Sequence, residues 1–415
     1  MKRALCGFLC LSFLLVGCFD KKELEEQGYV IGIGLDKGDN DTSFSQLNIT
    51  FQIANPEVGS AITGGGSNEQ PQQTVTLQAN DILTAINAAN SFVSRQISVD
   101  HTKIIVVSED LARTEQFLRI MQSVARSSEL RRGVQIIVSK EKASEFLINN
   151  DPTLETRPHK YFQLMLNRAR ETGIIPKGDV HRFFQLTEGD ADLFLAIYAT
   201  TIVDKKKENG FEDEYIAGEI PQLIGDRTQF MGSAVFKEGK MIDVIDGQET
   251  RLALILDHTS KLEDILATYP DPIDSNQRIA TRFIKKKKNK VDITYRKNAP
   301  SDISITVPFE IEVLAVPSLV NYSTEENKEK LRKSIEDNLN QKARELVQKT
   351  QEQYGTEPFY WSLYVRKNFL SIKDYEAANW NENIYPHAHV HVNFTLKKIR
   401  FGKLVKNSNL YEVRD

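Results

Sequence analysis

The chain has 415 residues, of which 40% are hydrophobic and 27% are charged, and its formal net charge is −4. This composition is typical of globular domains and excludes a disordered polyelectrolyte. The acidic balance argues against a nucleic-acid-binding protein, which usually carries a net basic domain.

The first residues have the pattern of a secretory signal peptide. Lys2 and Arg3 precede an apolar run at 4–16, and small Gly17 ends the segment. The run is too short to span a bilayer, which takes about 20 apolar residues. A cationic start, a short apolar core and a small residue before the cut are typical of secretion. We therefore expect residues 1–17 to be removed as a signal peptide.

Cys18 would be the first residue of the mature chain. Leu15-Val16-Gly17-Cys18 resembles the bacterial lipobox, in which the cysteine receives an S-diacylglyceryl group and an N-acyl group. One acyl chain holds a protein only marginally, whereas two anchor it stably. The other cysteines, Cys6 and Cys10, leave with the signal peptide, so the mature domains have no disulfide, cysteine nucleophile or thiolate metal site. The alternative is a plain exported protein with an incidental cysteine.

Strands and helices alternate through 18–190, which predicts an N-terminal mixed α/β domain. Asp81 or Asn80 offers the N-cap of a helix, and 55–73 has the composition of a loop. Strands are predicted at 29–35, 47–53, 74–77, 103–107 and 134–138, and helices at 82–93, 108–130, 142–148 and 161–169.

Residues 191–300 are predicted to form a middle mixed α/β domain. The lysine run at 285–290 is interpreted as an exposed hairpin tip or a lysine-protected edge. The alternative is contact with an anionic membrane, to which each cation contributes about 1 kcal/mol. The predicted strands are 194–203, 230–236, 241–245, 278–284 and 291–295, with a turn at 237–240 and a helix at 248–256.

Residues 301–405 are predicted to form a C-terminal domain with a long helix against a sheet. Residues 303–313 alternate strictly between apolar and polar, and Pro308 places that strand at an edge or a bulge. Ser323 and Glu326 have capping-box spacing, and they open a helix that Gly355 ends. A last strand is predicted at 388–399. The buried stripe of the helix is expected at Leu331, Ile335, Leu339, Ala343, Leu346 and Val347.

The whole pattern predicts an α+β (mixed α/β) fold of three consecutive domains, each a twisted sheet packed with helices. Two further interpretations are structural. Asp190 and Asp192 are read as solvated turn residues. A group of aromatic residues near the C-terminus is read as core in preference to an exposed contact surface, and it comprises Tyr360, Trp361, Tyr364, Phe369 and Trp380.

No constellation of residues indicates catalysis or a cofactor. His387, His389 and His391 could offer imidazole nitrogens to zinc. They are weak candidates, because three ligands on one strand diverge and the alternating valines take the core face. The glycines around 28–38 lack the spacing of a dinucleotide site, and no G-x-S-x-G elbow occurs.

Several stretches, taken in order, resemble the Ger(x)C family of spore germination lipoproteins. The family usually has tryptophan where Phe19 stands, and it commonly has glycine where Asp243 stands, a departure expected to affect only a local turn. The matching stretches are GCFDKKEL at 17–24, IGIGLDK at 31–37, GSAVFK at 232–237 with Lys240-Met241, Tyr354-Gly355, Trp361 and HVHV at 389–392.

The resemblance implies a non-enzymatic C subunit of a nutrient germinant receptor, required for nutrient-triggered germination. It implies A-type and transporter-like B-type subunits as partners, on the outer face of the spore inner membrane. Cys18 is the only functional residue that it assigns, and it leaves open whether this subunit binds a small molecule. The alternatives are a solute-binding lipoprotein that delivers a ligand to a transporter, with two lobes around one deep cleft, and a zinc-dependent exported enzyme using the histidines.

Overall fold

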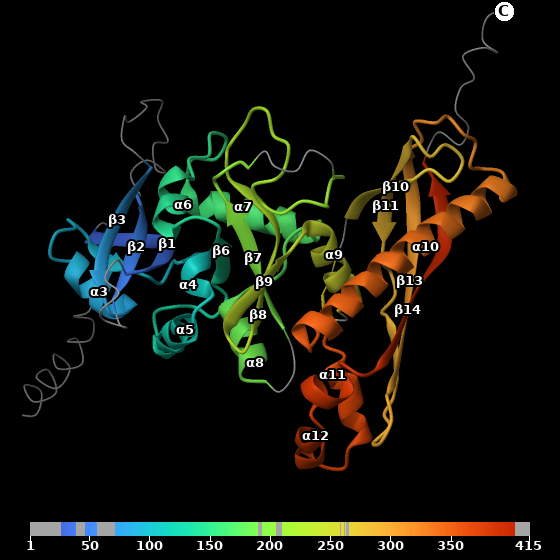
Figure 1. The fold of residues 1–415 in the computed structure, drawn as a ribbon. Coiled ribbons are helices and arrows are strands. Elements are labelled where there is room, and N and C mark those ends of the chain that lie inside the picture. The colour runs from blue at the N-terminus through green and yellow to red at the C-terminus, as the bar shows by residue number, and fades with distance from the viewer. Residues whose placement is uncertain are drawn as a thin grey trace, which may run out of the picture.

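The computed structural model describes residues 26–38, 46–55, 71–189, 193–204, 210–257, 259–260, 262 and 265–402. Cys18, most of the 55–73 loop, Asp190 and Asp192 lie outside these ranges. Figure 1 shows two lobes side by side, an N-terminal lobe built on the first sheet and a C-terminal lobe built on the second. Three sheets were expected and the described residues form two, because residues 191–300 contribute strands to both.

The first sheet has a parallel centre with antiparallel margins. Its strand order is β3-β2-β1-β5-β6-β7-β8-β9, with β4 beside the start of β1. The parallel strands β5, β6 and β7 are buried at every position, as expected when helices cover both faces. The strands are β1 Gln27–Lys37, β2 Leu47–Ala54, β3 Gln72–Ala79, β4 Gln96–Ser98, β5 Ile104–Ser108, β6 Gln135–Ser139, β7 Phe194–Thr200, β8 Gln229–Lys237 and β9 Lys240–Ile245.

Helices cover the two faces of this sheet and bury separate clusters. Phe117, Met121 and Phe183 belong to the cluster on one face, and Phe146 and Phe162 to the cluster on the other. The helix predicted at 108–130 is two helices, and α8, which Asp179 caps, was not predicted. The helices are α3 Ile82–Ala89, α4 Glu109–Ala112, α5 Gln116–Arg126, α6 Ala143–Asn149, α7 Pro158–Glu171 and α8 Val180–Thr187.

The second sheet is organised around β13, its longest strand. β14 runs parallel to β13 along its length, whereas β11 pairs with 310–315 of β13 and β12 pairs with 302–306. β11 and β12 are therefore not a hairpin but two collinear segments, and the lysine run bulges out between them. The strands are β10 Ile265–Pro270, β11 Arg278–Ile284, β12 Lys290–Thr294, β13 Asp302–Ala315 and β14 His389–Phe401.

Pro308 lies at the interruption between β12 and β11. The pairing of β13 with β14 also shifts register between Phe309 and Glu310. The bulge that Pro308 predicted is confirmed, and the edge position is wrong, because β13 has partners on both sides. A proline is tolerated here because the missing N–H falls where the ladder is already broken.

The long helix α10, Glu325–Lys349, packs along the second sheet (Figure 1). Thr324 is its N-cap, one residue beyond the predicted Ser323, and a π-helical turn at Thr350–Tyr354 leads to Gly355, whose φ is +70°. All six residues of the predicted apolar stripe are buried. Among the described residues, no helix is long and apolar enough to cross a membrane.

Side chains of α10 also occupy the outer edge of β14. Asn340 Oδ1 accepts from Phe394 N at 2.7 Å, and Glu336 Oε1 accepts from Leu396 N at 2.6 Å. Arg332 Nη1 donates to Leu396 O at 2.7 Å. These residues follow at four-residue intervals, so one side of the helix satisfies an otherwise unpaired strand edge.

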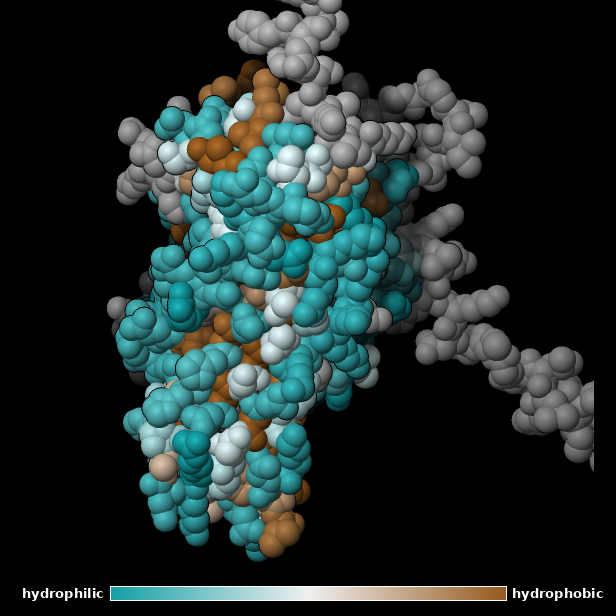
Figure 2. Space-filling view, turned by 90° about the vertical axis from the view of Figure 1, so that its right-hand side faces the viewer, coloured by the Kyte–Doolittle hydropathy of each residue, from teal (hydrophilic) through white to brown (hydrophobic). Residues whose placement is uncertain are grey.

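The face of the C-terminal lobe shown in Figure 2 is mostly hydrophilic, with apolar side chains gathered at one end and along a narrower band down its middle. Two loops at the β10–β11 end of the sheet are joined there, because Ser318 Oγ donates to Asp271 Oδ2 at 2.6 Å. Ile273 and Leu319 on these loops are 44% and 63% exposed.

Candidate functional site

The two lobes share one continuous core at their junction. Leu195, Val235 and Ile245 of the first sheet belong to the same buried cluster as α9, Gly247–Leu256, and the second sheet. Asp246 and Glu249 form a reciprocal capping box that starts α9. The junction is therefore packed, and polar contacts surround this packed centre.

A buried ion pair on α9 ties three distant segments together. Arg251 Nη1 lies 2.8 Å from Asp213 Oδ2, and the two side chains are 9% and 11% exposed. Arg251 also donates from Nε to Thr172 O at 2.9 Å and from Nη1 to Leu266 O at 3.0 Å. This one guanidinium therefore binds the end of α7, the segment that precedes β8, and also strand β10.

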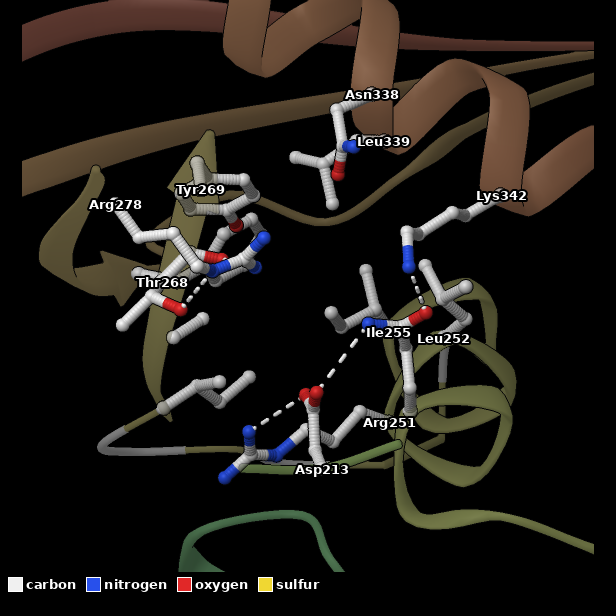
Figure 3. Close-up of a pocket in the computed structure, with 14 residues that line it drawn as sticks. Asp213, Arg251, Leu252, Ile255, Thr268, Tyr269, Arg278, Asn338, Leu339 and Lys342 are labelled. Carbon is white, nitrogen blue, oxygen red and sulfur yellow. Dashed lines mark hydrogen bonds and ion pairs between the residues drawn. The ribbon is translucent and has the colours of Figure 1, made fainter. Parts of the chain in front are cut away.

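A pocket of about 40 Å³ lies beside this ion pair (Figure 3). α9 and Asp213 form one wall, and β10, β11 and α10 form the other. Lys342 Nζ donates to Glu214 Oε1 at 3.0 Å and to Gln248 Oε1. Gln248 Nε2 in turn donates to Asp213 Oδ1 at 3.2 Å, so a chain of hydrogen bonds crosses from α10 to the buried ion pair.

Arg278 of β11 enters the same pocket. Its Nε donates to Thr268 Oγ1 and its Nη2 to Thr268 O, both at 2.8 Å. The guanidinium carbon lies 3.5 Å from the centre of the Phe211 ring, a cation–π contact that fixes the plane of the group.

Two tyrosines of the C-terminal lobe contact the N-terminal lobe. Tyr354 Oη donates to Asp243 Oδ2 at 2.5 Å, and Lys237 Nζ donates to Tyr354 O at 2.8 Å. Burial, together with Asp243, raises the pKa of Tyr354, so the hydroxyl stays a donor. Asp243, expected to affect only a local turn, thus joins the lobes.

Tyr360 is 4% exposed and belongs to the core cluster of the first sheet. Arg182 lies over its ring, 4.7 Å from the centre. Its φ is +62°, a left-handed conformation that costs a bulky residue about 1–3 kcal/mol. The core interpretation of the aromatic group is confirmed for Tyr360, Trp361 and Trp380, which are buried, while Tyr364 and Phe369 are partly buried.

Two residues of the lysine run donate hydrogen bonds to the C-terminus of α9. Lys285 Nζ donates to Ile255 O at 2.5 Å, and Asn289 Nδ2 donates to Ile255 O at 2.8 Å and Leu256 O at 3.0 Å. Carbonyls at a helix end lack intrahelical donors, and a cation there is favourable. The hairpin-tip interpretation is wrong, because the bulge turns Lys285 and Asn289 inward and leaves 286–288 exposed.

The lowered pKa of Lys285 predicts that the stability of the protein depends on pH. Burial lowers its pKa to about 8, whereas the unfolded side chain titrates near about 10.4. Between these values the unfolded state binds more protons, so stability rises with pH. We expect the free energy of unfolding of the native chain, measured against Lys285→Gln, to rise by about 2 kcal/mol from pH 8 to pH 10.

Chemical denaturation at a series of pH values measures this difference. Lys287→Gln is the matched control, because Lys287 is an exposed lysine of the same run. Parallel pH profiles for the native chain and Lys285→Gln would contradict the assignment.

The candidate histidines do not converge on a site. His387, His389 and His391 are exposed, as the solvent-face interpretation predicted, and His389 Nδ1 lies 3.4 Å from Asp302 Oδ1. Within the described ranges, no group of three or more His, Cys, Asp or Glu side chains is placed to hold a metal ion.

The junction residues were not predicted from the sequence. Arg251 had a detectable signal, since it directly precedes the apolar run LALIL in a predicted helix, and a lone cation beside a buried face needs a partner. The sequence gives no such signal at Asp213, Arg278 or Lys342, because only the fold brings these distant positions together.

Two sequence profiles match the chain. One is described as "Spore germination protein N-terminal domain" and matches residues 20–200; the other is described as "Spore germination B3/ GerAC like, C-terminal" and matches residues 231–402. Several proteins of Bacillus subtilis (strain 168) are similar. Spore germination protein B3 is 21% identical over 410 residues, covering 96% of this chain and 98% of that protein.

The putative spore germination protein YfkR is 23% identical over 325 residues, covering 77% of this chain and 76% of that protein. Spore germination protein KC is 29% identical over 152 residues, which span 36% of each chain. A solved structure titled "Crystal Structure of the GerBC protein" matches with a TM-score of 0.53 and 17% identity, covering 92% of this chain and all of that chain. This last similarity concerns the fold.

Proposed function

We propose, from the premise that the chain belongs to the GerAC/GerBC-like family of spore germination proteins, that it is a lipid-anchored, non-catalytic subunit of a germinant receptor. The lipid on Cys18 holds the folded body at the outer face of the spore inner membrane. There it assembles with A-type and transporter-like B-type subunits and is required for nutrient-triggered germination.

The lipobox at Cys18 carries this proposal. It ends two positions before residue 20, where the N-terminal family profile begins to match. A lipid on Cys18 would join the body by a short segment, because seven residues separate Cys18 from Glu26, the first described residue. An extended chain spans about 3.3–3.6 Å per residue, so the body would lie within about 25–30 Å of the anchor.

Cys18→Ala tests the anchor. We expect the variant to move from the membrane fraction to the soluble fraction, because at least two acyl chains are needed for stable attachment. Cys10→Ala is the matched control, since it removes a thiol from the same segment and leaves the lipobox intact. Immunoblots of fractionated cells measure the partition, and continued tight membrane binding of Cys18→Ala would contradict the proposal.

Spores of the same strains test the receptor role. The Cys18→Ala strain should sporulate normally and germinate poorly with at least one nutrient, while the Cys10→Ala strain germinates normally. Unchanged germination with every nutrient, in a strain that lacks related receptors, would contradict the receptor role even if the anchor is confirmed.

The solute-binding alternative has less support. It needs two lobes that close on a deep cleft, and pockets that enclose whole ligands usually measure about 300–1,000 Å³. Here a continuous core crosses the junction, and the pocket beside it measures about 40 Å³. A packed junction of this kind favours a body that holds a fixed shape between its partners.

A further inference from the structure

The junction pocket contains hydrogen-bond donors that no described residue uses. Tyr269 is 5% exposed and lines the pocket, yet its hydroxyl has no partner among the described residues. The Nη1 group of Arg278 and the side-chain amide of Asn338 are likewise without partners there. Figure 3 shows the three side chains around one space, from β10, β11 and α10. Arg278 and Asn338 are only partly buried, so these donors are reached by solvent and are open to an acceptor that enters the pocket.

Two of the three cations at the pocket form ion pairs with described residues, and Arg278 does not, although its charge also acts on Glu214. Arg251 pairs with Asp213, and Lys342 pairs with Glu214. Arg278, which is half-buried, makes hydrogen bonds only to Thr268 and forms no ion pair within the described ranges. The other carboxylate nearby, Glu212, is exposed and accepts from Thr268 Oγ1 at 3.0 Å. An acceptor that carries negative charge would complete the site.

The pocket size limits what that acceptor is. A water needs about 10–15 Å³, so the pocket volume of about 40 Å³ holds about three water-sized groups. A carboxylate has three heavy atoms and is planar, and it accepts two parallel hydrogen bonds from a guanidinium or its neighbours. Burial raises the pKa of Tyr269, so its hydroxyl is protonated at neutral pH and can donate.

We propose that this pocket binds the carboxylate of a small molecule, held by Arg278 Nη1, Tyr269 Oη and the Asn338 amide. These donors belong to the C-terminal lobe, and the opposite wall is the Asp213–Arg251 pair on the N-terminal side. A bound carboxylate stabilises the folded chain by mass action, and Arg251, which pairs with Asp213 at 2.8 Å, offsets the negative charge of the opposite wall. This inference is independent of the lipid anchor.

Calorimetric titration of the purified chain with sodium acetate at constant ionic strength tests the proposal. We expect saturable binding to the native chain and a rise in melting temperature with acetate concentration. Arg278→Gln and Tyr269→Phe should each weaken binding, the first by about tenfold or more, as for a lost hydrogen bond to a charged group. Arg282→Gln is the matched control on the same strand, because Arg282 pairs with Glu312 at 2.8 Å away from the pocket, and it should bind normally.

Three results would overturn the proposal. The first is no saturable acetate binding to the native chain, and the second is equal weakening in Arg282→Gln. The third is tighter binding of phosphate or chloride than of acetate, which would mean a different anion class. Tyr269→Phe removes one oxygen from a buried ring, so it keeps the test valid if Arg278→Gln fails to fold.

Discussion

Leu339→Asp is expected to unfold the C-terminal lobe at room temperature. Leu339 is 7% exposed on the buried face of α10. Deleting such a side chain costs about 2–5 kcal/mol, and desolvating a carboxylate costs several more. Leu339 also lines the junction pocket, whose donors offset only part of that second cost. The total reaches the whole stability of a typical domain, about 5–15 kcal/mol. Thermal denaturation followed by circular dichroism should show loss of the transition that belongs to this lobe.

Gln341→Asp is the matched control for this change. It introduces the same charge on the same helix, but Gln341 is exposed, and surface changes usually stay within about 0.5 kcal/mol. A native melting profile for Leu339→Asp would show that α10 does not pack as described. Equal destabilisation by both variants would show that the helix responds to charge and not to burial.

Elements with a regular period were predictable from the sequence. The stripe of α10 recurs every three or four residues, and all six of its members are buried. The alternation along β13 likewise places its apolar side chains in the core. These patterns arise because one face of each element contacts the core, which is a local property of the chain.

Pairing between distant segments was not predictable in the same way. β11 and β12 were read as a hairpin because they are neighbours in sequence, yet each pairs with β13. Their local patterns fit either arrangement, and only the partner strand decides between them. The same reason explains why three sheets were expected: β7 and β8 join the first sheet through β6, not a sheet of their own.

The junction site shows the same limit. Lys285 looked like an exposed lysine among others, and its role depends on α9, about 30 residues away in sequence. Asp243 contacts Tyr354 across the lobes, and nothing in the flanking residues of either position indicates this. The charged groups of the pocket are likewise separated in the chain, so they become a site only through the packing of α9 against the second sheet.

The buried ion pair of Arg251 gives the second large prediction. Arg251→Met is expected to destabilise the protein by about 3–5 kcal/mol, because it leaves Asp213 buried without its partner. It also removes the donor to Thr172 O and Leu266 O. Urea denaturation measures the change. Arg282→Met is the matched control, since the Arg282–Glu312 pair has the same 2.8 Å distance but is 40% and 27% exposed. An exposed pair contributes about 0–1 kcal/mol.

A double substitution separates the charge from the packing. Asp213→Leu in the Arg251→Met background removes the unpaired carboxylate, so it should restore part of the stability lost in Arg251→Met. The two carbonyls of Thr172 and Leu266 stay without their donor, so recovery should be incomplete. If Arg251→Met costs no more than Arg282→Met, the pair does not hold the junction. If Asp213→Leu restores nothing, the loss in Arg251→Met comes from the carbonyls and the side-chain volume, and the junction depends on the guanidinium as a donor more than as a charge.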